Sequence, residues 1–164
     1  MTASSNGRGY SRLPRLAMIA EYVKDFSFGN PSAPQSLAPS RQPMANLQVN
    51  VSARPLNAID VEVELRLDGE YSELEGAVLY RFTLAYAGIF GTEGIPRESL
   101  HLTVMTEGPR LLFPAAREIV AFMVRSAGFP AAPIEPVDFA ALYQCRTAPV
   151  AGPVAAPPSA AGGS

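Results

Sequence analysis

The stretch "DVEVELRLD", residues Asp60–Asp68, decides the fold of this 164-residue chain. Its odd positions are all apolar: Val61, Val63, Leu65 and Leu67. Its even positions are all charged: Asp60, Glu62, Glu64, Arg66 and Asp68. Successive side chains of a strand point to opposite faces of a sheet, so this alternation predicts a strand with one buried and one wet face. We expect the acids to lie on the solvent face, where they would also discourage edge-to-edge aggregation.

Three further segments read as strands. They are "YVKDFSF" (Tyr22–Phe28), "LQVNVSA" (Leu47–Ala53) and "VLYRFTLAYA" (Val78–Ala87). In the first, the even positions from Tyr22 to Phe28 are expected to share one face. Taken alone, residues 12–23 would also fit a helix, because their apolar residues have helical spacing. The short connections favour an antiparallel meander.

The second half of the chain changes to a helical period. Pro96 suits the first turn of a helix, which we expect to end near Gly108 and Pro109. A second helix is predicted from Pro114 within "LLFPAAREIVAFMVRSAGFP", with Gly128 as its C-terminal cap. Asp138 is predicted to cap a short third helix that runs through Cys145. Strands followed by helices indicate an α+β domain.

Composition divides the chain into three regions. Residues 1–15 are rich in Ser, Gly and Arg and are predicted to form a disordered N-terminal arm. Residues 16–146 form the expected folded domain. Residues 147–164, "TAPVAGPVAAPPSAAGGS", carry no acidic or basic side chain and are predicted to be a disordered tail.

The chain is apolar and weakly charged. Hydrophobic residues make up 48% and charged residues 17%, with a net charge of −2, whereas soluble domains have about 25% charged residues. This predicts that apolar surface is covered by another chain or kept open for a ligand, although the Ala-rich ends also raise the apolar share. No stretch approaches the roughly 20 apolar residues that span a bilayer. With a single cysteine, which suits a reducing compartment, we expect a cytoplasmic protein.

Residues that carry catalytic chemistry are scarce. His101 is the only histidine, and we expect it at a surface or a helix interface. Cys145 has no histidine nearby in sequence, so it is a weak nucleophile candidate. The glycine-rich "GIFGTEG" (Gly88–Gly94) lacks the Lys and Ser or Thr that end a phosphate-binding loop. We therefore expect no enzyme activity, metal or cofactor, and without a basic excess we expect no nucleic-acid partner.

Three motifs, in order, resemble the SecB export chaperone family. "YVKDFSFGNPSAP" (Tyr22–Pro34) resembles the N-terminal signature of that family, and "GPRLLFPAAREIVAFMVRSAGFP" (Gly108–Pro130) resembles its second signature. "PVDFAALY" (Pro136–Tyr143) resembles its C-terminal helix motif, and "AGIF" (Ala87–Phe90) fits the end of its fourth strand. The match covers about residues 16–146, and three motifs in order are more specific than any one of them.

The resemblance implies a four-stranded antiparallel sheet with helices packed on one face, assembled as a tetramer that is a dimer of dimers. Members of the family bind unfolded preproteins in an apolar groove without ATP and deliver them to the SecA motor. The aromatic residues near the strands and the long helix are candidates for the groove, and each has the alternative of being core: Phe26, Phe28, Phe113, Phe122 and Phe129. The helix from Pro96 is expected to meet its copies in the tetramer through Leu100, His101 and Val104.

The resemblance also maps the SecA-docking face of the family onto Asp25, Gly29, Arg81 and Thr83. Asp25 keeps its acid, but Gly29 and Thr83 stand where the family carries acids, and Arg81 stands for an apolar residue. These changes predict weak, salt-sensitive docking, partly offset by the field of the acidic strand Asp60–Asp68. The alternative is a dedicated chaperone or interaction protein of SecB fold, for example one associated with an antitoxin. A third reading, a small enzyme, would need a pocket with convergent ionisable groups.

Overall fold

The computed structural model describes residues 15–38, 43–74, 76–131 and 134–147. The predicted N-terminal arm and C-terminal tail lie outside these residues, except for Arg15 and Thr147. The elements in chain order are β1 (Ala17–Gly29), η1 (Gln35–Leu37), β2 (Met44–Pro55), β3 (Asp60–Ser72), β4 (Val78–Gly91), α1 (Arg97–Ser126) and α2 (Phe139–Thr147). The predicted α+β class and the four-stranded antiparallel sheet are confirmed.

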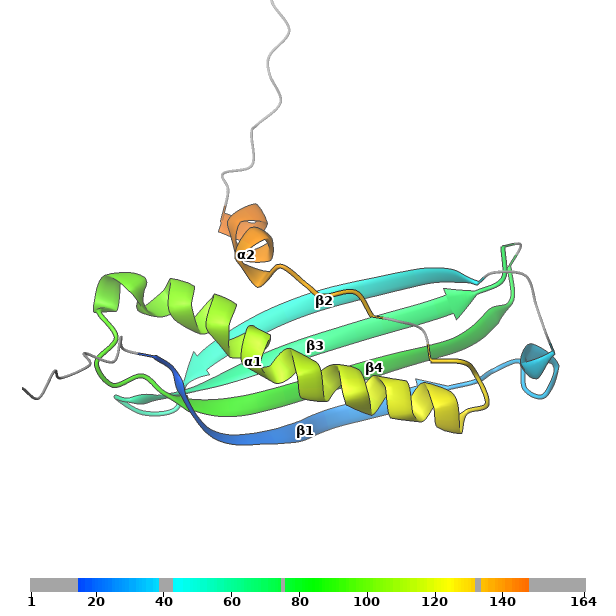
Figure 1. The fold of residues 1–164 in the computed structure, drawn as a ribbon, viewed down its shortest axis with the longest axis horizontal. Coiled ribbons are helices and arrows are strands. Elements are labelled where there is room, and N and C mark those ends of the chain that lie inside the picture. The colour runs from blue at the N-terminus through cyan, green and yellow to red at the C-terminus, as the bar shows by residue number, and fades with distance from the viewer. Residues whose placement is uncertain (1–14, 39–42, 75, 132–133, 148–164) are drawn as a thin grey trace, which may run out of the picture.

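The strand order is β1-β4-β3-β2. Strands β2, β3 and β4 form the predicted meander, but the meander is wrong for β1, which pairs with β4 instead of β2. The reason is the length of the two kinds of connection. The Asn57 side chain closes a tight β2–β3 turn by accepting hydrogen bonds from the N–H groups of Ile59 and Asp60, both at 2.9 Å. The longer connection between β1 and β2 allows these two strands to lie at opposite edges of the sheet (Figure 1).

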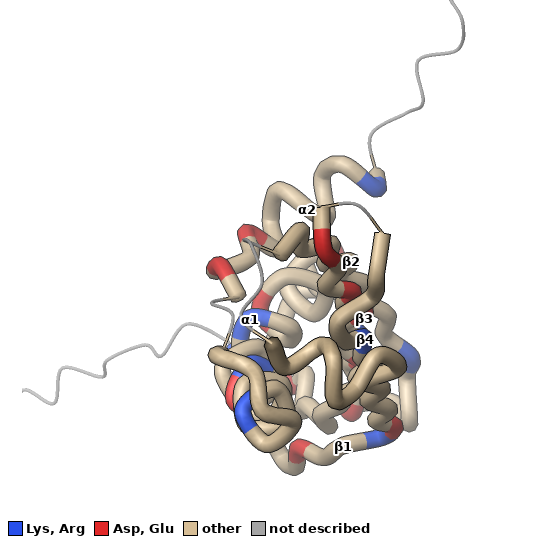
Figure 2. Tube along the Cα trace, turned by 90° about the vertical axis from the view of Figure 1, so that its right-hand side faces the viewer, with Lys and Arg blue, Asp and Glu red and all other residues tan. Residues whose placement is uncertain are grey.

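One face of the sheet is covered by α1 (Figure 1), and we call it the helix face. Leu65 of β3 is fully buried there beside its partner Tyr86 of β4. Viewed end-on, α1 and the sheet form two layers, with α2 near the β2 edge (Figure 2). The opposite face, which we call the outer face, carries the charged positions of β3.

Strand β1 changes phase in its middle. Tyr22 and Lys24 were expected to share a face with Phe26 and Phe28, and this expectation is wrong. A β-bulge between Val23 and Asp25 adds a residue, which shifts the alternation. Phe26 and Phe28 therefore pair with helix-face residues of β4, whereas Tyr22 and Lys24 lie on the outer face.

The two helices predicted around Pro109 and Pro114 are one continuous helix, α1, with both prolines inside it. A proline inside a helix costs about 3 kcal/mol. Burial offsets this cost, because each fully buried Leu or Val contributes roughly 1.5–3 kcal/mol, and α1 buries Leu112, Val120 and others against the sheet. Gly108 marks the close approach of the two layers rather than a helix end: a Cβ there would lie 2.9 Å from a methyl group of Val63.

Both predicted caps are confirmed. Gly128 has a φ of +90°, and α1 ends in a Schellman motif in which the N–H of Phe129 donates to the carbonyl of Val124 at 3.2 Å. The Asp138 carboxylate accepts a hydrogen bond from the N–H of Ala141 at 3.0 Å, which caps α2. These local signals hold because their hydrogen bonds join residues only a few positions apart.

Candidate docking face and client-binding surface

The four docking positions come together on the outer face. In the β1–β4 pairing, Gly29 is opposite Arg81, and Thr83 is opposite the neighbouring residue Ser27. Asp25 is opposite Ala85, which is the next pair on the same face, and Asp25 is exposed. The geometry thus joins the positions that the resemblance assigned, while their docking role stays a prediction.

A shallow hollow of about 490 Å³ lies at this end of the outer face. Its polar side chains come from all four strands and include Ser27, Gln48, Asp68, Glu70, Arg81 and Thr83. A hollow of this kind offers carboxylates, amides and hydroxyl groups to a partner.

Two contacts in the hollow explain what the changed positions do. Arg81 leans over Gly29, so that its Cγ lies 3.9 Å from the point where a Cβ on Gly29 would be. The Thr83 hydroxyl donates a hydrogen bond of 2.8 Å to Asp68 on β3. Sequence reasoning expected the acidic strand Asp60–Asp68 to support docking from a distance, but only the β3–β4 register shows that Asp68 and Thr83 are direct neighbours.

Glu62 lies at the centre of an ion-pair network elsewhere on the outer face. Its carboxylate accepts hydrogen bonds from the Tyr22 hydroxyl at 2.7 Å, the Lys24 ammonium at 2.7 Å and the Arg54 guanidinium at 2.9 Å. Lys24 also pairs with Glu64 at 2.8 Å. These bonds, first from Arg54, then from Lys24 and Tyr22, lower the pKa of Glu62 to about 2.

The prediction that Glu62 lies on a solvated face is therefore corrected, since only 5% of the residue is exposed. The side chains from β1 reach β3 by crossing β4 where its outer-face residues are small, at Ala85 and Ala87. Sequence gave no signal for this network, because the residues come from three strands whose register is not encoded locally.

The aromatic candidates do not converge on one groove. Phe28 and Phe129 both pack against Tyr80, with ring centroids 5.7 and 4.8 Å from the centroid of that ring. Phe113 is a core residue, 7% exposed, in edge contact with the Phe139 ring. Phe122 of α1 is 62% exposed, and it is the candidate that lies most openly on the surface.

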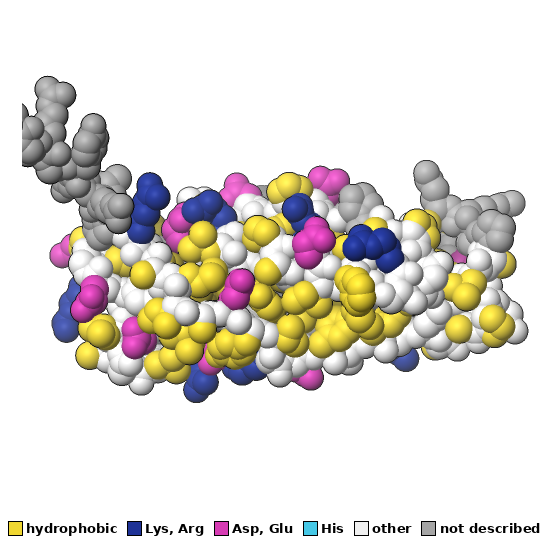
Figure 3. Space-filling model, turned by 60° about the horizontal axis from the view of Figure 1, so that its bottom comes forward, with side chains coloured by type: hydrophobic (Ala, Val, Ile, Leu, Met, Phe, Trp, Pro, Cys, Tyr) yellow, Lys and Arg dark blue, Asp and Glu magenta, His cyan; other side chains and the backbone are white. Residues whose placement is uncertain are grey.

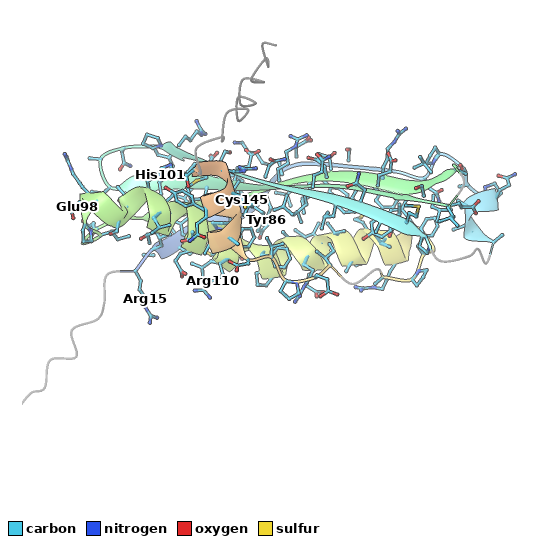
Figure 4. The ribbon with its side chains drawn as sticks, turned by 90° about the horizontal axis from the view of Figure 1, so that it is seen from above. Arg15, Tyr86, Glu98, His101, Arg110 and Cys145 are labelled. Carbon is cyan, nitrogen blue, oxygen red and sulfur yellow. The ribbon has the colours of Figure 1, made fainter. Side chains whose placement is uncertain are left out.

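An apolar crevice of about 90 Å³ lies between α1, α2 and β2, and the sequence did not predict it. Its lining includes Val51, Met105 and Leu142. His101 is exposed on α1 and lies beside α2 (Figure 4). It forms a hydrogen bond of 2.9 Å to the hydroxyl of Tyr143 on α2. No sequence pattern joins three elements in this way, so the crevice becomes visible only in the fold.

Only part of the helix surface that was expected to form the tetramer interface is exposed to solvent. Val104 is 4% exposed and belongs to the core, and Leu100 packs against the core, so of the three predicted contacts His101 alone is exposed. Apolar surface gathers instead along β1 and the adjoining part of α1 (Figure 3). Strand β1 contributes the exposed residues Met18, Ile19 and Val23, which are 40%, 59% and 47% exposed. Exposed apolar patches of this kind mark interaction sites.

Two further features concern the class of protein. Within the described ranges, no helix is long and apolar enough to cross a membrane. In the same part of the chain, His, Cys, Asp and Glu side chains form no group of three that could hold a metal ion. Neither observation distinguishes one binding partner from another.

Comparison with known proteins matches most of the chain to one family. The model of the family described as preprotein translocase subunit SecB matches residues 10–149. The protein-export protein SecB of Xanthobacter autotrophicus is 50% identical over 147 residues, which cover 89% of this chain and 94% of that protein. Its counterpart in Azorhizobium caulinodans is 53% identical over 134 residues, which cover 81% of this chain and 83% of that protein.

A solved structure shows the same fold at low identity. It is a SecB-like chaperone of Mycobacterium tuberculosis in complex with a peptide from the HigA1 antitoxin. The two folds agree with a TM-score of 0.62 at 15% identity, over 75% of this chain and 91% of the other. By its motifs, its fold and its similarity to these relatives, the chain belongs to the SecB family of protein-export chaperones.

Proposed function

We propose that the protein is an ATP-independent holdase that binds unfolded preproteins on apolar surface and keeps them competent for Sec-dependent export. The observation that carries the proposal is the exposed apolar surface of a family member, above all Phe122 on the outer side of α1. Leu102 and Leu111 of the same helix are also exposed, at 47% and 36%. Exposed apolar surface of this kind suits extended apolar segments, which unfolded proteins expose and folded proteins bury.

Close packing explains the glycines of the stretch Gly88–Gly94, so no bound nucleotide is needed to account for them. Gly88 and Gly91 lie within β4. A Cβ on Gly88 would lie 2.8 Å from a methyl group of Leu112 and 2.9 Å from the Phe90 ring. The glycine thus allows α1 to approach the sheet.

The proposal is tested by titrating the full chain into a reduced, unfolded protein that carries a fluorophore, with and without ATP. We expect saturable binding, identical in both series, with a negative heat-capacity change because apolar area is buried. Binding that requires ATP, or none at all, would remove the holdase proposal. A folded form of the same labelled protein is the control, and it should not bind.

Delivery to SecA is proposed to use the outer face, with Asp25 as the acid retained from the family pattern. The substitutions at Gly29, Arg81 and Thr83 support weak, salt-sensitive docking. Self-association as a tetramer, a dimer of dimers, is proposed from the apolar band along β1 and α1, which a second copy would cover.

The alternative is a dedicated chaperone or interaction protein of the same fold, for example one associated with an antitoxin. The changed docking positions favour this alternative. The number of different client proteins that the chain protects distinguishes the two functions. A general export chaperone should suppress the aggregation of several unrelated unfolded proteins at equal molar ratio, whereas a dedicated one should protect a single client.

A further inference from the structure

We infer that the open edge of β2 is a strand-addition site, at which an extended segment of an unfolded client pairs with the main chain, and that Arg146 of α2 closes one end of this edge. The inference rests on the proposed client-binding function and adds a mode of binding to it. Every segment of an unfolded polypeptide carries unpaired N–H and C=O groups, so a main-chain site accepts clients of unrelated sequence.

The pairing with β3 determines which main-chain groups of β2 face the open edge. At the β2–β3 turn, the N–H of Leu56 donates to the carbonyl of Asp60 at 2.9 Å, so these two residues form a hydrogen-bonded pair. Such pairs recur at every second residue of an antiparallel ladder, and the β2–β3 register runs without a shift. The even-numbered residues of β2 therefore bond to β3, whereas the odd-numbered residues point their N–H and C=O groups outward.

Two residues at the turn end of β2 agree with this assignment. Nη1 of Arg146 donates to the carbonyl oxygen of Val51 at 3.1 Å, and its Nη2 donates to Oδ1 of Asn50. The carbonyl of Val51 is thus directed away from β3. Pro55 is also odd-numbered, so its missing N–H falls on the open edge, where a proline is tolerated. Arg146 and Pro55 together close this end of the edge.

The rest of the edge is open. Ala45, Leu47 and Val49 point their main-chain groups outward, and within the described residues these groups form no hydrogen bond. The side chains of Leu47 and Val49 are half-buried and pack against the core on the helix face. A strand added here would pair with these three residues and place alternate side chains on the same apolar face. The apolar crevice lies at the end of this row, where Val51 lines it.

The two edges of the sheet differ in how they are protected. Edge strands usually avoid pairing with other chains through bulges, charged residues or prolines. Strand β1 has two register shifts and carries Glu21, Lys24 and Asp25. Strand β2 pairs without a register shift, and its residues 44–53 include neither a charged residue nor a proline. A regular and neutral edge of this kind is suited to pairing with another strand.

An unfolded client fits this edge better than a second copy of the chain. The exposed apolar side chains that we propose for self-association lie on β1, at the opposite edge of the sheet. Only alternate residues of a strand face its neighbour, so the open stretch of β2 takes a client segment of roughly six residues. So short a contact suits reversible binding, and neutral side chains on β2 exclude no client by its charge.

Amide hydrogen exchange of the full chain, measured residue by residue with and without the reduced, unfolded protein of the client titration, tests the inference. In the free chain, the N–H groups of Leu47 and Val49 should exchange rapidly, and those of Gln48 and Asn50 slowly because they bond to β3. Saturating client should slow the exchange of Leu47 and Val49 at least about tenfold and change Gln48 and Asn50 far less. Client binding without this alternation would overturn the inference. Slow exchange at Leu47 and Val49 in the free chain would also overturn it, because a second copy would then cover the edge.

A proline substitution tests the edge-facing N–H groups directly. Val49→Pro removes one of these groups and leaves the bonds to β3 in place, and Val49→Ala is the matched control for the lost side chain. We expect Val49→Pro to bind the client about threefold to tenfold more weakly than Val49→Ala does. Urea unfolding checks that both variants are folded. Equal affinities of two folded variants would count against strand addition, and the exchange pattern of the unmodified chain decides the question if Val49→Pro does not fold.

The role of Arg146 has its own test. Arg146→Ala should extend the client-protected stretch to the N–H of Val51 and tighten client binding about two- to fivefold. Arg97→Ala, which removes the same side chain from the exposed start of α1, is the matched control and should change neither. Protection that still stops at Val49 in Arg146→Ala would refute the closing role of Arg146. If the unmodified chain does not bind the client at all, the holdase proposal and the inference fail together, whereas binding without alternating protection removes the inference alone.

Discussion

Glu62 is a charged residue that the sheet holds almost entirely out of solvent. Its partners are side chains from β1 and β2, so the carboxylate connects one edge of the sheet to the other. Because both carboxylate oxygens accept hydrogen bonds from protein donors, the hydrogen-bonding capacity of Glu62 is satisfied without bulk water. The network also balances charge, because Lys24 and Arg54 pair with Glu62 and Glu64.

The network predicts a pH dependence of stability. The folded pKa of Glu62 is lowered from 4.5 to about 2. A lowered folded pKa means that the stabilisation is fully present above about pH 4.5 and is lost as the pH falls toward 2. Glu62→Gln should therefore lower the free energy of unfolding by about 0.5–2 kcal/mol at pH 7, a range reduced for solvent screening of its exposed partners. Urea unfolding at a series of pH values measures both effects.

Glu107→Gln is the matched control, because Glu107 pairs with Arg110 at 2.6 Å on an exposed stretch of α1. Its loss should change the unfolding free energy by no more than a few tenths of a kcal/mol. If the unmodified chain and Glu62→Gln lose stability in parallel between pH 5 and pH 2, the network does not stabilise the fold.

At the scale of elements, α1 has one buried side and one exposed side. Its inner side carries Leu112, Phe113, Ala116 and Val120 into the core, and its outer side presents Phe122 to solvent. The helix continues through its two prolines because burial of the inner side stabilises it by more than the lost hydrogen bonds destabilise it. The outer side is exposed, and it is the surface that we propose for client binding.

Two Phe→Ala substitutions on α1 distinguish these two sides. Phe113→Ala should lower the free energy of unfolding by about 3–5 kcal/mol, because it leaves a cavity in the core. Phe122→Ala should change stability by less than about 0.5 kcal/mol and weaken binding of an unfolded client. Urea unfolding and the client titration distinguish the two, with light scattering to check that assembly is unchanged. Client binding that survives Phe122→Ala intact would exclude this part of α1 from the client surface.

At the scale of the whole molecule, the exposed apolar edge strand β1 is the surface that we expect a second copy of the chain to cover. Strand β1 is an edge strand with exposed apolar side chains, and unprotected edges associate. Closed symmetry would make each contact self-complementary, which is consistent with a dimer of dimers.

Assembly is tested by light scattering at micromolar concentration, where we expect a mass near four chains. Ile19→Lys should reduce this mass, because it places a charge in the apolar band of β1, where Ile19 is 59% exposed. Leu74→Lys is the control, since Leu74 is 67% exposed in the β3–β4 turn and lies outside that band. A stable monomer of the unmodified chain, or equal masses for all three proteins, would contradict the proposed interface.

The sequence by itself determined the elements whose signals are local. Alternation located all four strands, and β1 is a strand although its first residues also fit a helix. The caps at Gly128 and Asp138 were predictable because their hydrogen bonds join residues close in the chain. The motifs identified the family, and with it the outer-face positions that the fold brings together.

Only the tertiary structure decided what depends on distant residues. It placed β1 beside β4, inserted the bulge before Asp25, and joined two expected helices into α1. It also made Phe113 core and Phe122 surface, and set Asp68 opposite Thr83. The physical reason is common to all of these. Strand register and burial are set by partners far away in sequence, and their free energies exceed the local preferences that a sequence pattern reports.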